Sequence, residues 1–515
     1  MLMSMMRNFL KLRSDSSNPL LLTLITGFFI WWFSCGAGTL CQAPLNKDFL
    51  DSVSINKLMC RATYEERSLG LLPTTVDFTH MDGRSSEIIS PNEFVKTDKD
   101  NLASNYITRS DGYMTSDSIS DSCDLRLLKK VTEVKDQGTC GSCWCFATMT
   151  ALESNLIKTN ANSSGYNFSE QHLNKYSGFD VGECVGGNHQ MATAYLATWK
   201  GPVYESDAPY DPLSGNDYSK AKAQKHIQEV IWLPNRSNAA DNECIKQSIM
   251  KNGAVYITFY WNDKYYKKPS YYCATPYKPN HAVTIVGWND NYSKDNFKGP
   301  LPEGDGAFIV KNSWGTAWGD KGYFYISYYD MTLANAMVIP PDAVQPTNNY
   351  TKKYEYDPLG LVNVAGYHND SAYFCNVFDV DNSYRSICAV SFYTPTINCS
   401  YEIWIYDKVT SNSPIGTEVL DIKGTEEFAG YHTIKFDEKC NISGGRFSVV
   451  VKLVSPKYIY PIPEHYNLEG YASNCNPSDG QSYISQDGKS WTDISSSKDR
   501  NETPKNVCIK AFAND

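Results

Sequence analysis

A cysteine at the start of a helix-permissive segment is the residue in this sequence best suited to nucleophilic chemistry. The run 137–146 reads Gln-Gly-Thr-Cys-Gly-Ser-Cys-Trp-Cys-Phe, and no Gly or Pro interrupts the residues that follow. Backbone N–H groups and the positive end of the helix dipole favour a thiolate at such a position. We therefore expect Cys143 to be a nucleophile and the amide of Gln137 to be an oxyanion donor. The alternative is one more disulfide or zinc cysteine, because Cys140 and Cys145 lie beside it.

A nucleophilic cysteine needs a base, and the base needs a group that orients it. Among the eight histidines, His281 stands out because it opens an alternating, β-branched strand at 281–288. A second strand, 306–311, leads to Asn312, which can accept a hydrogen bond from the imidazole, and to Trp314, which can keep water from that bond. Each feature alone is usually structural. Their order along the chain favours a Cys–His–Asn site.

This order of residues resembles the papain family of cysteine peptidases. Cys140-Gly-Ser-Cys-Trp144 matches the local signature around the nucleophile of that family. His281 follows Cys143 by 138 positions, within the family's spacing of roughly 130–150, whereas Asn312 follows by 169. A polar surface insertion at 290–306 accounts for the longer second spacing.

The resemblance implies a role for each matched residue. Cys143 is the nucleophile, His281 the base and then the acid, Asn312 the orienting residue and Gln137 the oxyanion donor. It also implies a thiolate–imidazolium pair, an acyl-enzyme intermediate and no metal or organic cofactor. Cys145 departs from the family's pattern, which usually has Ala there, and is interpreted as a buried thiol or an extra bridge.

The family's Cys-x-Gly-Gly segment is similar to 184–187 of this chain. The resemblance implies a disulfide between Cys140 and Cys184, and pairing of the glycine backbone with the main chain of the substrate. It also places a specificity-pocket wall at Ala282. The substrate-binding residues expected from these matches are Gly186, Gly187, Ala282 and Trp314.

Composition limits the compartment and the partners. The 515 residues carry 47 basic and 57 acidic side chains, with a pI of about 5.4, which argues against a nucleic-acid partner. Sixteen cysteines and several Asn-x-Ser/Thr sequons fit an extracellular or cell-surface glycoprotein. A cytosolic zinc protein is disfavoured because no Cys-x-x-Cys pair has a partner pair at zinc spacing.

The N-terminal part is predicted to contain two segments. Residues 1–42 hold three basic residues and then the apolar run 20–33, which indicates a signal peptide or a retained membrane anchor. Residues 43–120 are rich in Ser, Asp, Thr and Asn, and we expect them to be loosely ordered. Because they precede the catalytic residues, two interpretations are left open with equal weight: an inhibitory prosegment, or a spacer between the membrane and the catalytic domain.

The rest of the chain predicts an α+β peptidase followed by an all-β domain. Residues 121–338 are expected to form a papain-like fold with a helical half and a β half, and a proline-rich linker spans 339–352. Short alternating strands in 353–515 predict a β-sandwich. This segment resembles the lectin-like domain that follows the peptidase in some secreted bacterial and archaeal members of the family. Its six cysteines could form three bridges.

The leading hypothesis is a secreted or surface-attached cysteine endopeptidase whose partners are protein or peptide substrates. The C-terminal domain is a candidate for binding a cell-surface glycan or protein. Two alternatives remain: a catalytically silent adhesion protein, and a transpeptidase that uses the same site. The intact set of Cys143, His281, Asn312 and Gln137 disfavours the first alternative.

Overall fold

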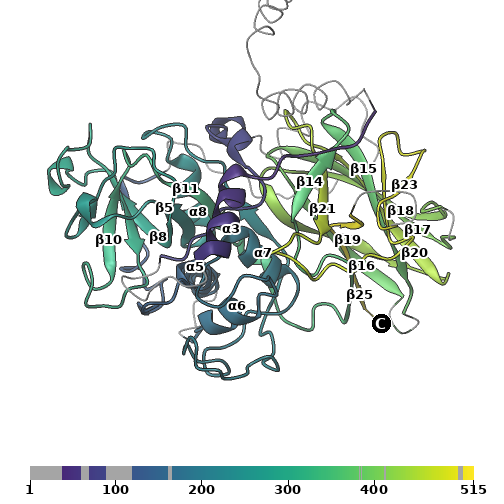
Figure 1. Cartoon of the computed structure of the whole chain (residues 1–515), viewed down its shortest axis with the longest axis horizontal. Helices are drawn as coiled ribbons and strands as arrows, with labels where there is room; N and C mark the ends of the chain where they lie inside the picture. Colours follow the sequence, from purple (N-terminus) through teal and green to yellow (C-terminus); the bar gives the residue numbers. More distant parts are fainter. Residues whose placement is uncertain are drawn as a thin grey trace, which may run out of the picture.

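The computed structural model describes residues 38–59, 69–88, 119–159, 165–381, 383, 385–410, 413–496 and 503–514. They form a central domain of helices and strands, a C-terminal domain made of strands, and an N-terminal strap that lies across both (Figure 1). We define the strap as residues 38–59 and 69–88. Among the described residues, no helix is long and apolar enough to cross a membrane. Residues 1–37 of the predicted signal peptide or anchor, which include the apolar run at 20–33, lie outside the described residues, whereas its last five residues, 38–42, are described and belong to the strap.

One helix forms the centre of the helical half of the central domain. Helix α5 (Cys143–Thr159) is buried from Cys143 through Leu156, as expected for a helix whose faces are almost all apolar. Two shorter helices pack against it: α6 (Glu170–Tyr176) and α7 (His189–Ala197). Ser169 caps α6 by accepting a hydrogen bond from the backbone N–H of His172.

The β half of the central domain is a mainly antiparallel sheet, in which only the β10–β7 pair among the described strands is parallel, and helix α8 (Glu243–Asn252) packs on it. Four neighbouring strands form the middle of this sheet, and the two predicted at 281–288 and 306–311 are present with nearly the expected bounds. The four strands are β5 (Val255–Phe259), β8 (His281–Asn289), β9 (Ala307–Lys311) and β10 (Tyr323–Ser327). The other strands of this half are β2 (Ser122–Asp124), β3 (His226–Ile227), β4 (Val230–Trp232), β6 (Tyr266–Lys267), β7 (Ser270–Tyr271) and β11 (Ala334–Val338), with the 3-10 turns η5 (Asp263–Tyr265) and η6 (Lys294–Asn296). The predicted insertion at 290–306 is the β8–β9 connection, and η6 lies in it.

The C-terminal domain is all β, as predicted. A six-stranded sheet has the order β18-β17-β20-β15-β22-β23, and strands β13, β25, β16 and β19 form one end of a second sheet. A hydrophobic cluster joins side chains of the first sheet, such as Phe374 and Val451, to side chains of the second, such as Val390 and Ala511. The strands are β13 (Lys352–Glu355), β14 (Asn363–Gly366), β15 (Ser371–Asp379), β16 (Ser386–Thr394), β17 (Cys399–Asp407), β18 (Thr417–Glu426), β19 (Ala429–Asn441), β20 (Arg446–Val454), β21 (Ile462–Tyr466), β22 (Ser482–Ser485), β23 (Thr492–Asp493), β24 (Lys505–Val507) and β25 (Ile509–Asn514).

The two domains share one sheet. Strand β19 of the C-terminal domain pairs with β4 of the central domain through the register Ala429↔Trp232, Gly430↔Ile231 and Tyr431↔Val230. The resulting 13-stranded sheet runs from β13 in the C-terminal domain to β6 in the central domain. Backbone hydrogen bonds therefore cross the domain boundary without a break.

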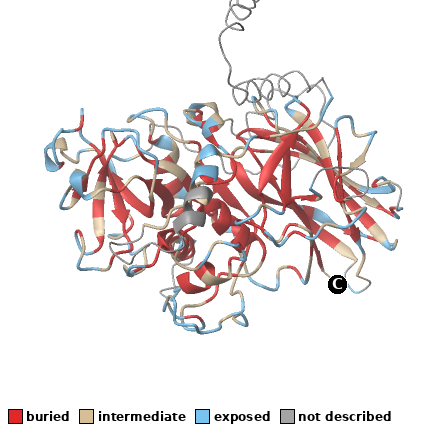
Figure 2. Ribbon diagram, viewed as in Figure 1, coloured by how far each residue is buried: buried red, intermediate tan, exposed pale blue. Residues whose placement is uncertain are grey.

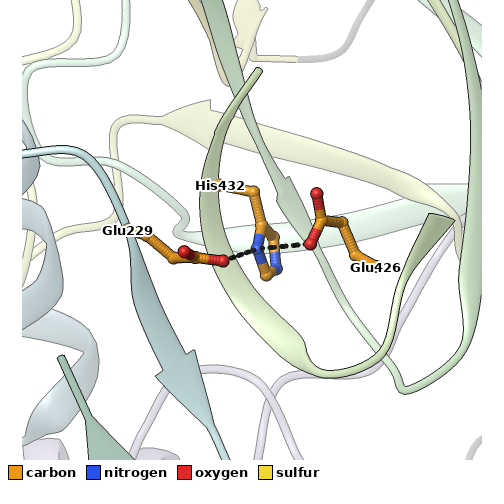
Figure 3. Close-up of side chains that lie close together, drawn as sticks. All are labelled: Glu229, Glu426 and His432. Atoms are coloured by element: carbon orange, nitrogen blue, oxygen red, sulfur yellow. Dashed lines mark hydrogen bonds and ion pairs between the residues drawn. The ribbon is translucent and has the colours of Figure 1, made fainter. Parts of the chain in front are cut away.

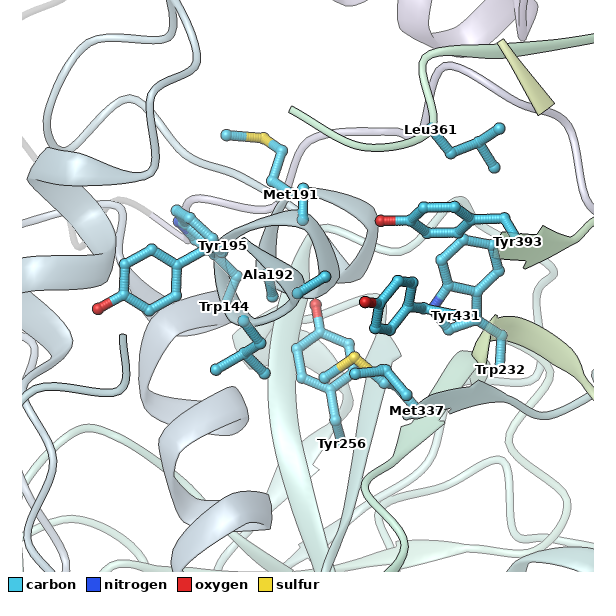
Figure 4. Close-up of a cluster of buried hydrophobic side chains, with 14 of the residues drawn as sticks. Trp144, Met191, Ala192, Tyr195, Trp232, Tyr256, Met337, Leu361, Tyr393 and Tyr431 are labelled. Atoms are coloured by element: carbon cyan, nitrogen blue, oxygen red, sulfur yellow. The ribbon is translucent and has the colours of Figure 1, made fainter. Parts of the chain in front are cut away.

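The hydrophobic core is also continuous across this boundary. One cluster of buried side chains contains Trp144 and Tyr256 of the central domain together with Tyr393 and Tyr431 of the C-terminal domain (Figure 4). Trp232 of the central domain belongs to the same cluster, with its ring centroid 6.1 Å from that of Tyr393. Buried residues extend through both domains, including the seam between them (Figure 2). Fully burying one large apolar side chain contributes about 1.5–3 kcal/mol, so the seam is a substantial part of the fold.

The strap is ordered, so the prediction that the whole of residues 43–120 is loosely ordered is wrong for this part. Strand β1 (Cys41–Gln42) pairs with β14 of the C-terminal domain, and helix α3 (Lys47–Met59) follows. Phe49 of α3 packs edge-on against Tyr471, 5.1 Å between ring centroids. The 3-10 turns η2 (Thr79–Met81) and η3 (Ser85–Glu87) complete the strap. Its order comes from contacts with both domains, because its own sequence has little apolar periodicity.

The cysteines differ from the expectation. Among the described residues, Cys140–Cys184 is the disulfide, and the thiols of the six C-terminal cysteines are all unbonded. The suggestion that these six form three bridges is therefore wrong. Five of them lie inside the all-β domain with exposed fractions of 5% or less, where a thiol packs as a small apolar group. The six C-terminal cysteines are Cys375, Cys388, Cys399, Cys440, Cys475 and Cys508.

The predicted linker at 339–352 is structured. It holds the 3-10 turn η7 (Pro341–Ala343) and strand β12 (Val344–Gln345), and β12 pairs with β3 of the central domain. The connection between the domains is thus attached to the central domain rather than free of it.

Candidate active site

Cys143 lies at the first position of α5, as the sequence predicts. The tight loop 138–142 precedes it, and its side chain is fully buried between α5 and β8. The backbone N–H of Ala282 donates a hydrogen bond to Cys143 Sγ over 3.4 Å. Ala282 is the residue after His281, so this contact brings the heads of α5 and β8 together. The predicted nucleophile and the predicted base are therefore neighbours, although 138 positions separate them in the sequence.

His281 and Asn312 are held together by two adjacent strands. His281 opens β8, Asn312 directly follows β9, and these strands pair in an antiparallel ladder. His281 Nε2 lies 2.9 Å from Asn312 Oδ1, and the indole of Trp314 stacks on the imidazole at 4.7 Å between centroids. The amide oxygen can only accept, so Nε2 carries a hydrogen and Nδ1 becomes the basic nitrogen. Trp314 covers the His281–Asn312 bond, as the sequence predicts.

Gln137 connects the loop of the nucleophile to the segment after Asn312. Its side-chain nitrogen donates to the carbonyl oxygen of Cys140 at 2.8 Å, and its side-chain oxygen accepts from the Ser313 hydroxyl at 2.6 Å. The Gln137 backbone N–H also donates to the Ser313 carbonyl oxygen at 2.8 Å. The amide is thus fixed close to the loop that carries Cys143, which is where an oxyanion donor must lie.

The Cys184–Gly187 segment lies beside the same loop. The expected Cys140–Cys184 disulfide is present, with the two Cα atoms 4.6 Å apart. The backbone N–H of Gly141 donates to the Cys184 carbonyl oxygen at 3.1 Å. Gly187 packs against the Trp144 indole so closely that a Cβ atom would come within 2.3 Å of it. The structure therefore brings Gly186 and Gly187 to the head of α5, together with Ala282.

The strap pairs with the backbone of Gly187, one of the residues that the sequence predicts to bind substrate. The backbone N–H of Gly187 donates to the Gly70 carbonyl oxygen at 3.0 Å, and the N–H of Leu72 donates to the Gly187 carbonyl oxygen at 2.9 Å. A Cβ atom on Gly186 would lie 2.7 Å from the Gly70 carbonyl oxygen. The strap backbone thus takes both hydrogen-bonding groups of Gly187. It also seals the site, because the exposed fractions of Cys143 and His281 are both 0%.

Burial sets the protonation of the covered site. It raises the pKa of Cys143 to about 12, against the backbone N–H groups that lower it. It lowers the pKa of His281 to about 4, against the hydrogen bond to Asn312 that raises it. Both shifts favour the uncharged forms. The thiolate–imidazolium pair expected from the resemblance is therefore not the favoured state while the strap covers the site.

Beneath the site lies a buried network of charges. Lys135 donates to Glu170, with Nζ 2.7 Å from Oε2, and Glu205 lies 3.6 Å from the same ammonium. Lys311, the last residue of β9 before Asn312, donates to the hydroxyls of Thr132 and Thr150 at 3.2 and 3.3 Å. This network joins the strand that carries Asn312 to the segment that carries Gln137.

Sequence reasoning did not identify the strap residues that cover the site. The available signal was the apolar island at 72–78 in an otherwise polar segment, immediately after Gly70. His189 is close in sequence to Gly187, but its ring faces Phe78 and Trp232 at 6.2 and 5.5 Å between centroids. It is buried, and burial lowers its pKa to about 3. His189 is therefore part of the core.

Comparisons with known proteins agree with this site. Residues 119–340 match the papain family cysteine protease domain, and residues 353–513 match a lectin-like domain. The central domain is thus a papain-like cysteine peptidase domain, and the chain joins it to a C-terminal lectin-like domain.

The same two domains occur together in Cwp84, described as a surface layer associated protein of Clostridium difficile. The crystal structure of its cysteine protease and lectin-like domains has a TM-score of 0.70 and 25% identity to this chain, covering 93% of this chain and 99% of that one. A second structure, a cysteine-to-alanine variant of Cwp84 after propeptide cleavage, has a TM-score of 0.65 and 28% identity. It covers 77% of this chain and 100% of its own.

Curated relatives match the peptidase domain alone. The viral cathepsin of Epiphyas postvittana nucleopolyhedrovirus is 35% identical over 205 residues, which is 39% of this chain and 58% of the relative. Bovine pro-cathepsin H is 32% identical over 203 residues, 38% of this chain and 56% of the relative. The chain thus spans less than two thirds of the length of these relatives.

Proposed function

We propose that this chain is the latent form of a cysteine endopeptidase that hydrolyses peptide bonds in protein or peptide substrates. The observation that carries the proposal is the buried constellation at the head of α5. There, His281 Nε2 is hydrogen-bonded to Asn312 Oδ1 at 2.9 Å. The backbone N–H of the neighbouring Ala282 donates a hydrogen bond to Cys143 Sγ at 3.4 Å. A nucleophile, a base and an orienting group in contact are the requirements for acyl transfer.

Each residue has one step in the proposed reaction. His281 takes the proton of the Cys143 thiol, and Cys143 Sγ attacks the peptide carbonyl carbon. The oxyanion that forms accepts hydrogen bonds from the Gln137 amide and from the Cys143 backbone N–H. His281 then gives its proton to the leaving amine, and water, deprotonated by the same imidazole, hydrolyses the thioester. Gly186, Gly187, Ala282 and Trp314 are proposed to hold the substrate chain and exclude water.

The strap is proposed to be an inhibitory prosegment rather than a spacer. Its residues 70–72 use the hydrogen-bonding groups of Gly187, and its cover keeps the thiol and the imidazole uncharged. Removal of the strap would readmit water, and solvation lowers the free energy of the charged pair. Release of the strap would therefore both open the cleft and activate the nucleophile.

An extracellular or cell-surface location fits the sequons and the Cys140–Cys184 disulfide. The similarity to Cwp84, a surface layer associated protein by its description, supports the same location for this chain. The lectin-like domain is a candidate for attachment to a surface glycan or protein. Its fold alone does not specify sugar binding.

The test is labelling by an epoxysuccinyl thiol inhibitor, measured by mass spectrometry on the full-length chain and on a chain that begins at Ser120. We expect labelling of one thiol, Cys143, and faster labelling of the shorter chain. Cys143→Ala should abolish labelling, and Cys145→Ala should preserve it. Peptide hydrolysis should follow the same pattern.

Each alternative has its own outcome. A folded shorter chain that neither labels nor hydrolyses peptides would support a silent adhesion protein and overturn the proposal. Transfer of the acyl group to an added amine, in preference to water, would support a transpeptidase. Equal labelling rates of the two chains would remove the inhibitory role of the strap while leaving the peptidase assignment intact.

A further inference from the structure

Three titratable side chains that take no part in the proposed reaction meet at the seam between the domains. Glu229 directly precedes β4 of the central domain, Glu426 ends β18, and His432 lies in β19 (Figure 3). Their exposed fractions are 4%, 6% and 1%. His432 Nδ1 lies 3.0 Å from Glu229 Oε1 and 3.3 Å from Glu426 Oε2. One nitrogen and two carboxylate oxygens from both domains therefore converge on one buried point.

The hydrogen bonds behind the imidazole orient it toward this point. The hydroxyl of Thr394 donates its single hydrogen to the carbonyl oxygen of Phe428 at 3.0 Å. The same oxygen lies 2.9 Å from His432 Nε2 and therefore accepts from an Nε2–H. In the neutral imidazole this leaves a lone pair on Nδ1, directed at the two carboxylates. Histidines that bind metals are held in this way, by a hydrogen bond on the other ring nitrogen.

The distances suit a small divalent cation. Two ligand atoms that lie about 2.1 Å from a metal, at angles of about 90–110°, are about 3.0–3.4 Å from each other. The separations of 3.0 and 3.3 Å fall in this range. An imidazole with two carboxylates suits Zn²⁺ and related transition metals, whereas Ca²⁺ and Mg²⁺ prefer sets made only of oxygen. A divalent cation also brings two positive charges to two buried carboxylates.

We propose that Glu229, Glu426 and His432 form a binding site for a divalent transition-metal cation, with Zn²⁺ as the representative ion, at the seam between the two domains. Glu229 comes from the central domain and the other two ligands from the lectin-like domain. The cation would therefore fasten the β4–β19 junction, adjacent to the register pair Tyr431↔Val230. Its role is structural, because all three ligands are separate from the residues proposed for catalysis.

Metal content of the full-length Cys143→Ala chain is the direct measurement, since this background removes the catalytic thiol as a zinc ligand. The protein is stripped with EDTA, dialysed against Zn²⁺ and assayed by mass spectrometry of the metal. We expect one more bound Zn²⁺ per chain in this background than after Glu426→Gln or His432→Gln. Glu427→Gln, which neutralises the adjacent carboxylate without removing a ligand, should retain the ion.

Three further measurements test the site by properties other than metal content. Zn²⁺ should raise the thermal unfolding midpoint of the parent chain, and this rise should be lost after Glu426→Gln. Thr394→Val, which removes only the bond to Nε2, should weaken the zinc affinity by about 10–100-fold. Bound Co²⁺ should show ligand-field absorption without a thiolate charge-transfer band.

Equal zinc content in the parent and in the ligand variants would overturn the proposal. So would an unchanged unfolding midpoint of the folded parent in Zn²⁺. The cluster would then be a hydrogen-bonded imidazolium shared by two carboxylates. A cobalt spectrum dominated by thiolate bands would also contradict it, since it would place the ion on cysteines elsewhere in the chain.

Discussion

Gly70 of the strap lies directly against Gly141 of the loop that carries Cys143. A Cβ atom on Gly70 would come within 2.1 Å of the Gly141 carbonyl oxygen, and Gly70 has a φ of +74°. Position 70 must therefore be glycine for the strap to lie this close to the loop. This contact gives a way to loosen the strap without touching the catalytic residues.

Gly70→Ala is expected to open the site of the full-length chain. The left-handed backbone alone costs alanine about 1–2 kcal/mol, which corresponds to about a five- to thirtyfold larger open population. The overlap with Gly141 adds to this. Epoxysuccinyl labelling of Cys143 should therefore be faster by at least that factor. Gly165→Ala is the matched control, because its Cβ atom would meet nothing within 4 Å. An unchanged labelling rate for Gly70→Ala would show that this contact does not hold the strap in place.

Alkylation of Cys143 in the full-length chain should depend steeply on pH. Burial raises the thiol pKa from 9.0 to about 12, so the thiolate fraction at neutral pH is about a thousandfold smaller than for an ordinary cysteine. The rate with iodoacetamide should rise about tenfold for each pH step between 7 and 10. The chain beginning at Ser120 should already react at neutral pH, with a shallower dependence. Cys143→Ala gives the background from the other thiols. A flat profile in the full-length chain would contradict the neutral thiol.

Removing Lys135 should destabilise the fold beneath the site. Burial raises the pKa of Glu170, and the ammonium of Lys135, 2.7 Å away, opposes that rise. Lys135→Met leaves the buried carboxylate without this cation and should lower the free energy of unfolding by about 3–5 kcal/mol. Urea denaturation measures the loss.

The double variant Lys135→Met/Glu170→Gln provides the control for this prediction. It also removes the charge that needs the cation, so it should recover part of the lost stability. A double variant as unstable as the sum of the single variants would show that the two side chains act independently.

Gly430→Ala should weaken the junction between the domains. Gly430 has a φ of +137°, and its Cβ atom would come within 2.1 Å of the Val230 carbonyl oxygen in β4. We expect a loss of about 1–3 kcal/mol, as for other overpacked sites. Fluorescence of the whole chain and exposure of Cys143 to a thiol reagent should report the same lowered urea midpoint. Gly445→Ala, which meets nothing within 4 Å, is the control. Separate midpoints from the two signals would argue against a shared core.

The sequence was sufficient for the parts of the fold that local patterns encode. Apolar, β-branched runs predicted β8 and β9 to within one residue at each end, because both strands are buried. The cysteine signature and the strand-opening histidine predicted that Cys143 and His281 would meet. The chain between Cys143 and His281 passes from the helical half into the β half, and the sequence predicted this order of a helical half and a β half.

Other features depend on contacts that leave no local trace. Helix α3 is stabilised by packing such as that of Phe49 on Tyr471, more than 400 positions away, so its sequence alone resembles a polar loop. The pairing of β4 with β19 could not be predicted, because a pattern of apolar residues indicates a strand without indicating which other strand it pairs with. The cluster of Glu229, Glu426 and His432 follows from that pairing, so these residues could not be selected beforehand. The C-terminal cysteines suggested bridges because sequence gives their number but not their separations.

The continuous sheet and core set a limit on modularity. Family comparison divides the chain near residues 340 and 353, but Trp232 and Tyr256 on one side are buried against Tyr393 and Tyr431 on the other. A peptidase cut out at that division would present this aromatic surface to water, and a lectin-like domain cut out alone would lose the strand partner of β19. The domains that the family comparison delimits are therefore not separate folding units in this protein. Any exchange of its peptidase or its lectin-like domain with that of a relative must carry matching residues on both sides of the seam.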